Sequence, residues 1–505
     1  MTTFSETIAQ AYAVDGAAVD LGRGVHEGAL EADAVVRLPL ATMNRHGLIA
    51  GATGTGKTRT LQLLAEQLSD AGVSVFAADY KGDLSGLEDP GAADGPAPKR
   101  MAELGLPYEA TAYPVEFLAL GGIGAGVPVR ATVTDFGPEL LAKVLQANET
   151  QEQSLALVFR FADDRGLALI DLADLRALLT YLDSDAGKAD LTGIGGVSGQ
   201  TIGVLLRALV ELEDGGGTEF FGEPLFEISD LLRVAPDGRG VISALELSAI
   251  QDKPALFSTA LMWLLAELFE QLPEVGDLEQ PKLVFFFDEA HLLFSDATKS
   301  FLESVTRTVR MIRSKGVGVF FVTQSPTDVP SEVLGQLGAR IQHALRAFTP
   351  NDADALKKTV RTYPTSEFYD LEQLLTQLGT GEAAVTILSE RGVPTPVVHT
   401  RLRAPRSSMT TSPGIDAAAK SSPLYAKYGT RLEKDSAAEQ LAKRVDQAPT
   451  PSAGDGEGEG APRTPRARKA KQPTDALTDF LGSRQGKTLQ REVIRGAFSL
   501  LRKRL

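Results

Sequence analysis

The chain has 505 residues, of which 43% are hydrophobic and 23% charged, and it contains no cysteine. This length predicts about three structural units, and the composition is that of an ordinary soluble globular chain, which excludes wholesale disorder. Without cysteine the chain has no disulfide framework, thiolate zinc site, iron–sulfur cluster or cysteine nucleophile. Its five histidines stand at no metal-ligand spacing, so they predict no histidine-based metal site.

The apolar segments predict a protein without a membrane anchor. The first residues lack the basic region and apolar core of a secretory signal. The longest apolar stretch, residues 255–269, is interrupted by Glu267 and is shorter than the about 20 residues that a bilayer span needs. We therefore expect a buried helix there and a cytoplasmic protein.

Charge is distributed unevenly along the chain. Residues 401–505 contain 21 Lys+Arg and 11 Asp+Glu, whereas residues 1–400 contain 30 and 55. An acidic body does not favour non-specific nucleic-acid binding, which depends on neutralising phosphates. It still allows DNA binding through a local basic stripe or a positive ring lumen. The basic run that begins at Arg463 either contacts phosphates or is a solvated spacer.

A βαβ unit begins at residue 48. Residues 48–50 predict a short strand, residues 51–57 a glycine-rich loop, and residues 58–71 a helix with leucines on one face. A buried strand follows at residues 73–78. Such a unit implies a parallel sheet covered by helices, and therefore an α/β fold.

Further apolar runs predict that the sheet continues along the chain. The remaining strands are expected at 240–245, 283–287, 317–323 and 340–345, with 383–388 and 396–402 closing the domain. Residues 85–127, rich in Gly, Pro and Ala, are expected to leave the sheet. Residues 138–213 are expected to be mostly helical.

Composition divides the chain into five expected parts. They are a small N-terminal β element (1–40), a main α/β domain (41–405) with a helical insertion at about 138–225, a C-terminal extension (406–446), a disordered basic linker (447–473) and an amphipathic helix (474–505).

The glycine-rich loop carries the first chemical motif. It matches the pattern G-x-x-x-x-G-K-[ST] and consists of Gly51, Ala52, Thr53, Gly54, Thr55, Gly56, Lys57 and Thr58. In this pattern successive backbone N–H groups surround a phosphate at the positive end of a helix. Lys57 would reach the β- and γ-phosphates of ATP, and the Thr58 hydroxyl would ligate Mg²⁺. The alternative, an ordinary glycine-rich turn, does not explain the position between a strand and a helix.

A pair of carboxylates ends the strand at 283–287. Such a position points into the crevice where α/β sheets bind ligands. Asp288 is predicted to hold Mg²⁺ through water, and Glu289 to act as the general base on the attacking water. The alternative is that the pair only caps the next helix.

Gln324 ends the strand at 317–323 and is a candidate contact for the γ-phosphate or the attacking water. Asp79 and Asp83, after the second strand, either position nucleotide or water, or form a structural turn around Lys81 and Gly82.

The order of GATGTGKT, FFFDEAH and GVGVFFVTQSP resembles the HerA/FtsK superfamily of RecA-like P-loop ATPases, and within it the bacterial HerA-like helicase group. The similarity covers roughly residues 40–405 and again 475–505. It implies a homo-hexameric ring with ATP sites between subunits, double-stranded DNA in the lumen, and a nuclease or another protein as a possible partner.

Rings of this kind need an arginine supplied by the neighbouring subunit. Arg307, Arg310 and Arg313 lie three residues apart on a helix predicted at 298–314. Arg313 is the first candidate because it precedes the strand that ends in Gln324, and Arg340 is the second. The alternative is that these arginines form surface ion pairs.

The sequence therefore predicts an ATP hydrolase that acts as a DNA translocase or helicase. Two alternatives stay open. One is an ATPase that energises protein or DNA transport, which belongs to the same superfamily. The other is a nucleotide-gated scaffold that recruits partners, against which the intact Glu289 argues.

Overall fold

The computed structural model describes residues 3–191, 195–276, 278–294, 299–389, 391–432 and 436–446. The chain divides into two compact units. Among the described residues, the first comprises 3–131, 140–147 and 207–432, and the second 132–139, 148–206 and 436–446. Within the described ranges, every helix falls short of the length or apolarity that a bilayer span requires.

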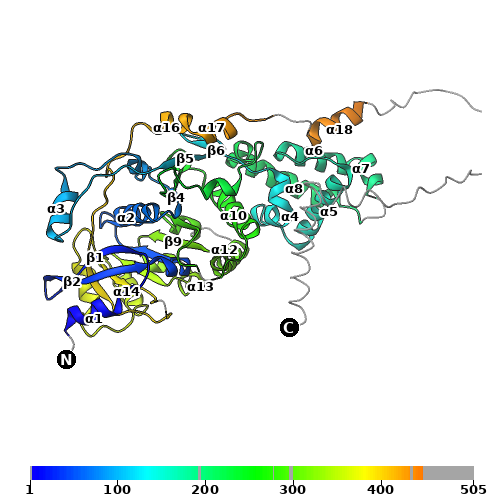
Figure 1. The fold of residues 1–505 in the computed structure, drawn as a ribbon. Coiled ribbons are helices and arrows are strands. Elements are labelled where there is room, and N and C mark those ends of the chain that lie inside the picture. Colours follow the sequence, from blue (N-terminus) through cyan, green and yellow to red (C-terminus); the bar gives the residue numbers. More distant parts are fainter. Residues whose placement is uncertain are drawn as a thin grey trace, which may run out of the picture. The chain divides into compact units, whose positions relative to one another are not determined.

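The first unit contains a twelve-stranded sheet (Figure 1). Its spatial order is β2-β1-β12-β11-β10-β3-β9-β8-β4-β7-β5-β6. From β10 to β6 neighbouring strands are parallel, and from β2 to β10 they are antiparallel. The strands are β1 Ala18–His26, β2 Ala29–Pro39, β3 Gly47–Ala50, β4 Ser74–Asp79, β5 Val115–Leu120, β6 Val127–Val129, β7 Ile242–Glu246, β8 Leu283–Phe287, β9 Val317–Thr323, β10 Ala339–Gln342, β11 Glu382–Thr386 and β12 Val398–Leu402.

Helices surround this sheet and build the second unit. The first unit contains α1 Phe4–Ala11, α2 Lys57–Asp70, α3 Pro96–Glu103, α9 Thr218–Phe220, α10 Pro254–Gln271, α11 His291–Phe294, α12 Lys299–Ile312, α13 Ser331–Leu334, α14 Pro350–Val360, α15 Leu371–Gln377, α16 Ile415–Ser421 and α17 Pro423–Tyr428. The second contains α5 Glu149–Arg165, α6 Leu172–Asp183, α7 Asp185–Asp190 and α18 Ala437–Asp446. Helices α4 Val133–Val144 and α8 Gly199–Leu212 contribute residues to both.

The two faces of the central strands have separate packing partners, because side chains alternate along a strand. One face packs against α2, in a cluster that includes Ile49, Val75, Val284, Phe286, Phe320, Val322, Leu61, Leu64 and Leu68. The other face carries a row of phenylalanines, in which Phe76–Phe285 and Phe287–Phe321 have ring centroids 4.6 and 5.7 Å apart. Burial on both faces explains why β8 and β9 are almost wholly apolar.

Three sequence-based expectations about the sheet need correction. Only the first part of residues 85–127 leaves the sheet: residues 85–114 contain no strand, whereas β5 pairs with β7 and β6 pairs with β5. Four glycines in the turn between β5 and β6 give the segment a loop-like composition. The strands near the N-terminus, β1 and β2, are not a separate element, because β1 pairs with β12 of the main sheet. The strand expected at 340–345 ends at Gln342, where the chain turns to pack on the glycine-rich loop.

The domain boundaries expected from the sequence also differ from the boundaries of the two units. Of the predicted helical insertion at about 138–225, residues 148–206 belong to the second unit, whereas residues 140–147 and 207–225 belong to the first. The predicted extension, 406–446, likewise contributes residues to both units. The predicted linker (447–473) and terminal helix (474–505) lie outside the described residues.

Candidate active site

The glycine-rich loop connects β3 to α2 at the carboxyl end of the parallel strands. Gly54 and Gly56 have φ values of 79° and 114°, a region that glycine occupies without steric cost. A Cβ atom at Gly54 would meet no atom within 4 Å, whereas one at Gly51 would lie 2.5 Å from Cβ of His343. The loop is therefore open at Gly54 and closely packed at its base.

The Lys57 ammonium lies against the loop. Its Nζ donates to the carbonyl oxygen of Gly51 at 2.7 Å and of Ala52 at 3.3 Å. The residue is 8% exposed. This burial lowers the pKa of Lys57, and the negative charge of Glu289 opposes the effect. A buried cation next to the open side of the loop attracts an anion.

The loop and its surroundings fit the phosphates and metal of Mg-ATP. The N–H groups of Gly54, Gly56 and Lys57 donate to no protein acceptor in the described part of the chain, and α2 begins at Lys57. Free N–H groups at a helix N-terminus bind phosphate. The Thr58 hydroxyl and the Asp288 carboxylate are oxygen donors of the kind that Mg²⁺ takes.

The two predicted carboxylates follow β8 directly and are 5% (Asp288) and 4% (Glu289) exposed. Burial raises the pKa of Asp288 to about 7, and the charges of Glu289 and Asp79 add to the effect. Glu289 has a φ of 49°, a strained conformation for a residue with a side chain. The next N–H, that of Ala290, donates to Val322 O at 2.8 Å, which ties this turn to β9.

Lys81 was not predicted as a site residue, but it completes this group. Its Nζ forms a hydrogen-bonded ion pair with Oε1 of Glu289. Lys81 lies in a turn that Asp79 organises, because the Asp79 carboxylate accepts the N–H groups of Gly82 at 2.8 Å and Leu84 at 2.7 Å. The structural alternative for Asp79 therefore agrees with this geometry. The sequence showed only a lysine just after a predicted strand, and the position of that strand beside β8 appears only in the fold.

A further missed carboxyl group is Glu246, which ends β7 opposite Asp79. It is 5% exposed, and its Oε1 has no hydrogen-bond partner in the described part of the chain. Burial raises the pKa of Glu246 to about 8, and the charge of Asp79 adds to the effect. Glu246 is therefore mostly protonated at neutral pH and adds little negative charge to this edge of the sheet.

Gln324 lies at the same edge, because β9 stands between β3 and β8. Its side chain is exposed. The adjacent Thr323 donates its hydroxyl to Oδ2 of Asp328 at 2.7 Å, and the N–H of Ser325 donates to the same oxygen at 2.9 Å. The structure thus places Gln324 on the edge that carries Lys57.

The structure does not bring the predicted arginines to this edge. Arg313 directly follows α12 and precedes β9, so it lies at the amino edge of the sheet. The seven residues of β9, at about 3.3 Å per residue, separate this edge from the carboxyl edge by roughly 20 Å. Arg307, Arg310 and Arg313 are exposed. Arg310 and Arg313 line a cavity of about 280 Å³ with Asn44.

Arg340 is placed differently. It lies within β10, and its guanidinium donates to the carbonyl oxygens of Thr362 at 2.6 Å and Leu334 at 3.4 Å. It also lies over the ring of Tyr363, 5.7 Å from the centroid. These contacts occupy the guanidinium within its own subunit.

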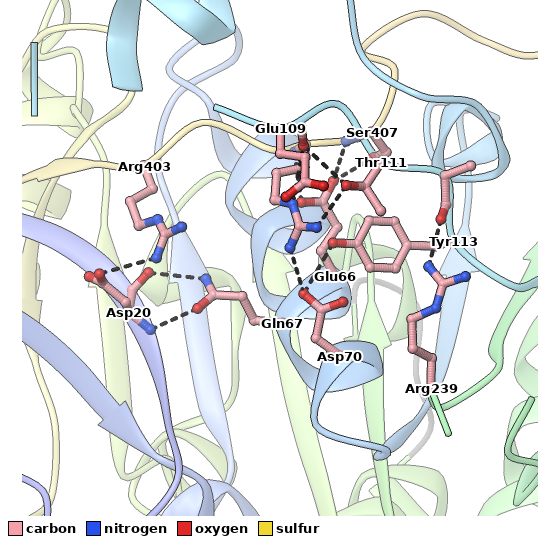
Figure 2. A network of polar contacts seen from close by, with 12 residues as sticks. Asp20, Glu66, Gln67, Asp70, Glu109, Thr111, Tyr113, Arg239, Arg403 and Ser407 are labelled. Atoms are coloured by element: carbon pink, nitrogen blue, oxygen red, sulfur yellow. Dashed lines mark hydrogen bonds and ion pairs between the residues drawn. The ribbon is translucent and has the colours of Figure 1, made fainter. Parts of the chain in front are cut away.

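Behind the loop, a segment after β12 lies along α2 and is held by polar contacts. Figure 2 shows the buried Glu66 of α2 next to Ser407, and Asp70 next to Tyr113. Glu66 accepts the N–H groups of Arg406 at 2.8 Å and Ser407 at 2.9 Å. Nearer the start of α2, Gln62 donates to Ser408 O at 2.7 Å. We call residues 403–412 the strap.

A family model and a related protein match this chain. The family model described as Helicase HerA-like C-terminal matches residues 26–500. A probable helicase of Methanocaldococcus jannaschii is 30% identical over 154 residues. That match spans 28% of this chain and 28% of the relative, so the chain corresponds to little more than a quarter of that protein's length.

Solved structures of the plasmid coupling protein TrwB share the fold. TrwB in complex with the ATP analogue ADPNP is 16% identical, with a TM-score of 0.52 over 80% of this chain and 94% of that chain. A form of the same protein without its first residues, TrwBdeltaN70, is 15% identical, with a TM-score of 0.51 over 81% and 95%. TrwB was also solved with ADP and Mg²⁺. The predicted fold class, a RecA-like P-loop fold with a mostly parallel sheet covered by helices, is confirmed.

Proposed function

The chain belongs to the HerA-like helicase C-terminal family and is a P-loop ATPase, and from this membership and the site geometry we propose that it is an ATP-driven ring motor acting on double-stranded DNA. We include in this proposal a homo-hexamer, Mg-ATP as the fuel and a cytoplasmic location. A nuclease or another protein would couple the motor to its task.

One observation supports the ring above all. The phosphate loop and carboxylates lie at the carboxyl edge of the sheet, whereas Arg310 and Arg313 are exposed at the opposite edge. A motor of this class needs an arginine at the γ-phosphate. These arginines can reach a phosphate loop only on another copy of the chain. Head-to-tail contacts of this kind form a ring when the rotation that relates neighbouring copies closes.

The proposed roles follow from position. Residues 51–58 hold the phosphates, with Lys57 on the β- and γ-phosphates and Thr58 and Asp288 on Mg²⁺. Glu289 takes a proton from the attacking water, and Gln324 contacts that water or the γ-phosphate. Arg313 of a neighbouring subunit stabilises the charge that develops on the transferred phosphoryl group. We propose Arg340 only as the second candidate, because its donors are satisfied by carbonyl groups.

The steady-state rate of ATP hydrolysis, measured with and without long duplex DNA, tests the proposal. We expect duplex DNA to stimulate the rate several-fold. Lys57→Ala is the blank, and Glu289→Gln should bind ATP but hardly turn over. No hydrolysis by the parent protein would overturn the ATPase role, whereas hydrolysis that DNA leaves unchanged would contradict the DNA motor and favour a protein-directed machine.

The basic C-terminal residues supply a second arm of this test. Residues 447–505 contain 12 basic and 6 acidic residues, and phosphate contacts of this kind weaken steeply with salt. A chain ending at residue 446 should therefore bind duplex DNA more weakly and with a smaller salt dependence. Its hydrolysis of ATP without DNA should stay unchanged. Equal DNA binding by the two chains would make the tail a passive spacer.

A further inference from the structure

The strand order determines on which side of the glycine-rich loop the nucleoside of ATP lies, and this inference rests on the proposed ATPase function. The loop follows β3, which stands between β9 and β10. The carboxylates Asp288 and Glu289 follow β8, which lies beyond β9. The γ-phosphate must point toward these carboxylates for hydrolysis. The nucleoside, at the other end of the triphosphate, therefore leaves the loop on the side of β10.

Two segments of the chain flank the loop on that side. The segment after β10 is joined to it, because the N–H of Ala52 donates to Ala344 O at 2.8 Å. The segment before β11 is also joined to it, because the N–H of Gly381 donates to Thr55 O at 3.0 Å. Arg100 holds this second segment, since its guanidinium donates to Gly381 O at 3.0 Å. We therefore expect the nucleoside to meet backbone that is already fixed to the phosphate loop.

The segment after β10 carries an uncovered aromatic ring. Phe348 is 84% exposed, more than any other large apolar residue in the described part of the chain. Its backbone is nonetheless fixed, because its N–H donates to Oδ2 of Asp352 at 3.2 Å, next to Thr349, which caps α14. An apolar side chain before a helix cap often packs on the first turn of that helix. At 84% exposure the ring of Phe348 does not, so local helix packing does not explain it.

Phe348 also lies close enough to the loop to meet a bound nucleotide. Ala344 and Leu345 pack with Leu356 of α14 in one apolar cluster, which anchors the chain on both sides of Phe348. Phe348 follows Ala344 by four residues, so at about 3.5 Å per residue the two lie within roughly 14 Å of each other. This is within the reach of a nucleoside triphosphate whose phosphates occupy the loop.

We propose that Phe348 binds the base of ATP by stacking on its face. Aromatic side chains stack on nucleobases, and the contact tolerates different bases because every base has a π-face. A purine covers more of a phenyl ring than a pyrimidine does. The site should therefore favour purine nucleoside triphosphates, without distinguishing ATP from GTP through this contact.

Titration calorimetry with two ligands tests the proposal. The ATP analogue ADPNP has a base, whereas inorganic tripolyphosphate has only phosphates, and both are used with Mg²⁺. Phe348→Ala should weaken ADPNP binding by roughly five- to a hundredfold and leave tripolyphosphate binding unchanged. Phe348→Tyr keeps an aromatic ring and should keep the parent affinity. Val393→Ala, which removes a 60% exposed apolar side chain between β11 and β12, is the matched control and should bind both ligands as the parent does.

Fluorescence of Phe348→Trp reports the contact itself. The chain has one tryptophan, Trp263, which is 1% exposed, so the difference from the parent spectrum isolates the introduced indole. ADPNP should quench this emission several-fold because the base stacks on the indole, and tripolyphosphate should not. Quenching by neither ligand would overturn the proposal. Equal quenching by both would overturn it as well, because it would report a movement of the loop without stacking.

A second copy of the chain could cover Phe348 instead of the base. In that case the emission of Phe348→Trp would move to shorter wavelength as protein concentration rises without nucleotide, and ADPNP would not quench it. This result would overturn the proposal in favour of a subunit contact.

The outcomes separate this inference from the function on which it rests. If the parent protein binds neither ADPNP nor tripolyphosphate, the proposed function fails and the inference fails with it. If the parent binds ADPNP and Phe348→Ala binds it equally well, only the inference fails.

Discussion

Nε2 of His343 lies 2.9 Å from the hydroxyl oxygen of Thr60, joining the turn after β10 to the first turn of the phosphate-loop helix. The Thr60 hydroxyl also reaches Gly56 O at 3.3 Å, inside the loop. Burial lowers the pKa of His343 to about 4, and the charge of Lys57 adds to the effect. A neutral imidazole therefore supports the loop from behind.

Thr60→Val keeps the shape of Thr60 and removes its hydroxyl group. Because Nε2 of His343 is then buried without a partner, the free energy of unfolding should fall by about 1–3 kcal/mol. Chemical denaturation monitored by circular dichroism gives this value. Thr376→Val, on the exposed surface of α15, is the matched control and should change stability by less than about 0.5 kcal/mol. Equal losses in both variants would contradict a role for the His343 contact.

Asp288→Asn should stabilise the protein in a pH-dependent manner. Since the folded state raises the pKa of Asp288 to about 7, ionisation of this carboxyl costs stability as pH rises from its unfolded value near 4. The variant should therefore equal the parent near pH 4, gain through pH 4–7, and be more stable by roughly 1–4 kcal/mol above pH 7.

Unfolding at pH 4 and pH 8 measures this difference. Asp354→Asn, on the exposed face of α14, is the control and should show no such trend. If the gain in unfolding free energy is equal at pH 4 and pH 8, ionisation of Asp288 does not destabilise the folded protein. Asp288→Asn should also lose Mg-dependent ATP hydrolysis, because it lacks the carboxylate proposed to hold Mg²⁺. Activity then requires a buried charge that lowers stability.

Local patterns were sufficient to predict the centre of the fold. The spacing of Gly51 to Thr58 determines a strand–loop–helix unit by itself, and the apolar runs before Asp288 and Gln324 mark strands that are buried on both faces. Because the carboxyl ends of parallel strands meet at one edge, these motifs could be expected there without knowledge of the strand order.

The residues that sequence analysis missed depend on that order. Lys81 meets Glu289 only because β4 lies beside β8, although the two residues are 208 positions apart. Glu246 reaches Asp79 for the same reason, through the pairing of β4 with β7. By sequence Arg340 was the second candidate after Arg313, and the carbonyl contacts of its guanidinium could be seen only in the fold.

The strap should loosen when its buried anchor is changed. Glu66→Gln leaves one acceptor oxygen and places an amide N–H₂ against the N–H donors of Arg406 and Ser407. We expect faster hydrogen exchange at the amides of residues 406–408, and a loss of about 1–3 kcal/mol in unfolding free energy. Glu211→Gln, exposed on α8, should alter neither. Unchanged exchange in Glu66→Gln would show that other contacts hold the strap on α2.

The arrangement of a phosphate loop and an arginine at opposite edges predicts complementation between two inactive proteins. Lys57→Ala lacks a working phosphate loop but keeps Arg313, and Arg313→Ala has the reverse defect. Each alone should hydrolyse almost no ATP. When the two are unfolded together and refolded as a mixture, about a quarter of randomly formed interfaces should combine an intact Lys57 with an intact Arg313, and activity should return to that extent.

Mixing Lys57→Ala in the same way with Arg307→Ala, or with Arg340→Ala, identifies which arginine serves the neighbouring ATP site. Arg307 lies on α12, the helix that Arg313 directly follows, so Arg307→Ala should be active alone if only Arg313 reaches the phosphate. Arg340→Ala loses contacts within its own subunit and should therefore be less stable. Mixing it with Lys57→Ala should give no more activity than the folded part of the Arg340→Ala protein shows by itself. Mixed rings of Lys57→Ala and Arg313→Ala that assemble yet stay inactive would show that Arg313 does not serve a neighbouring site.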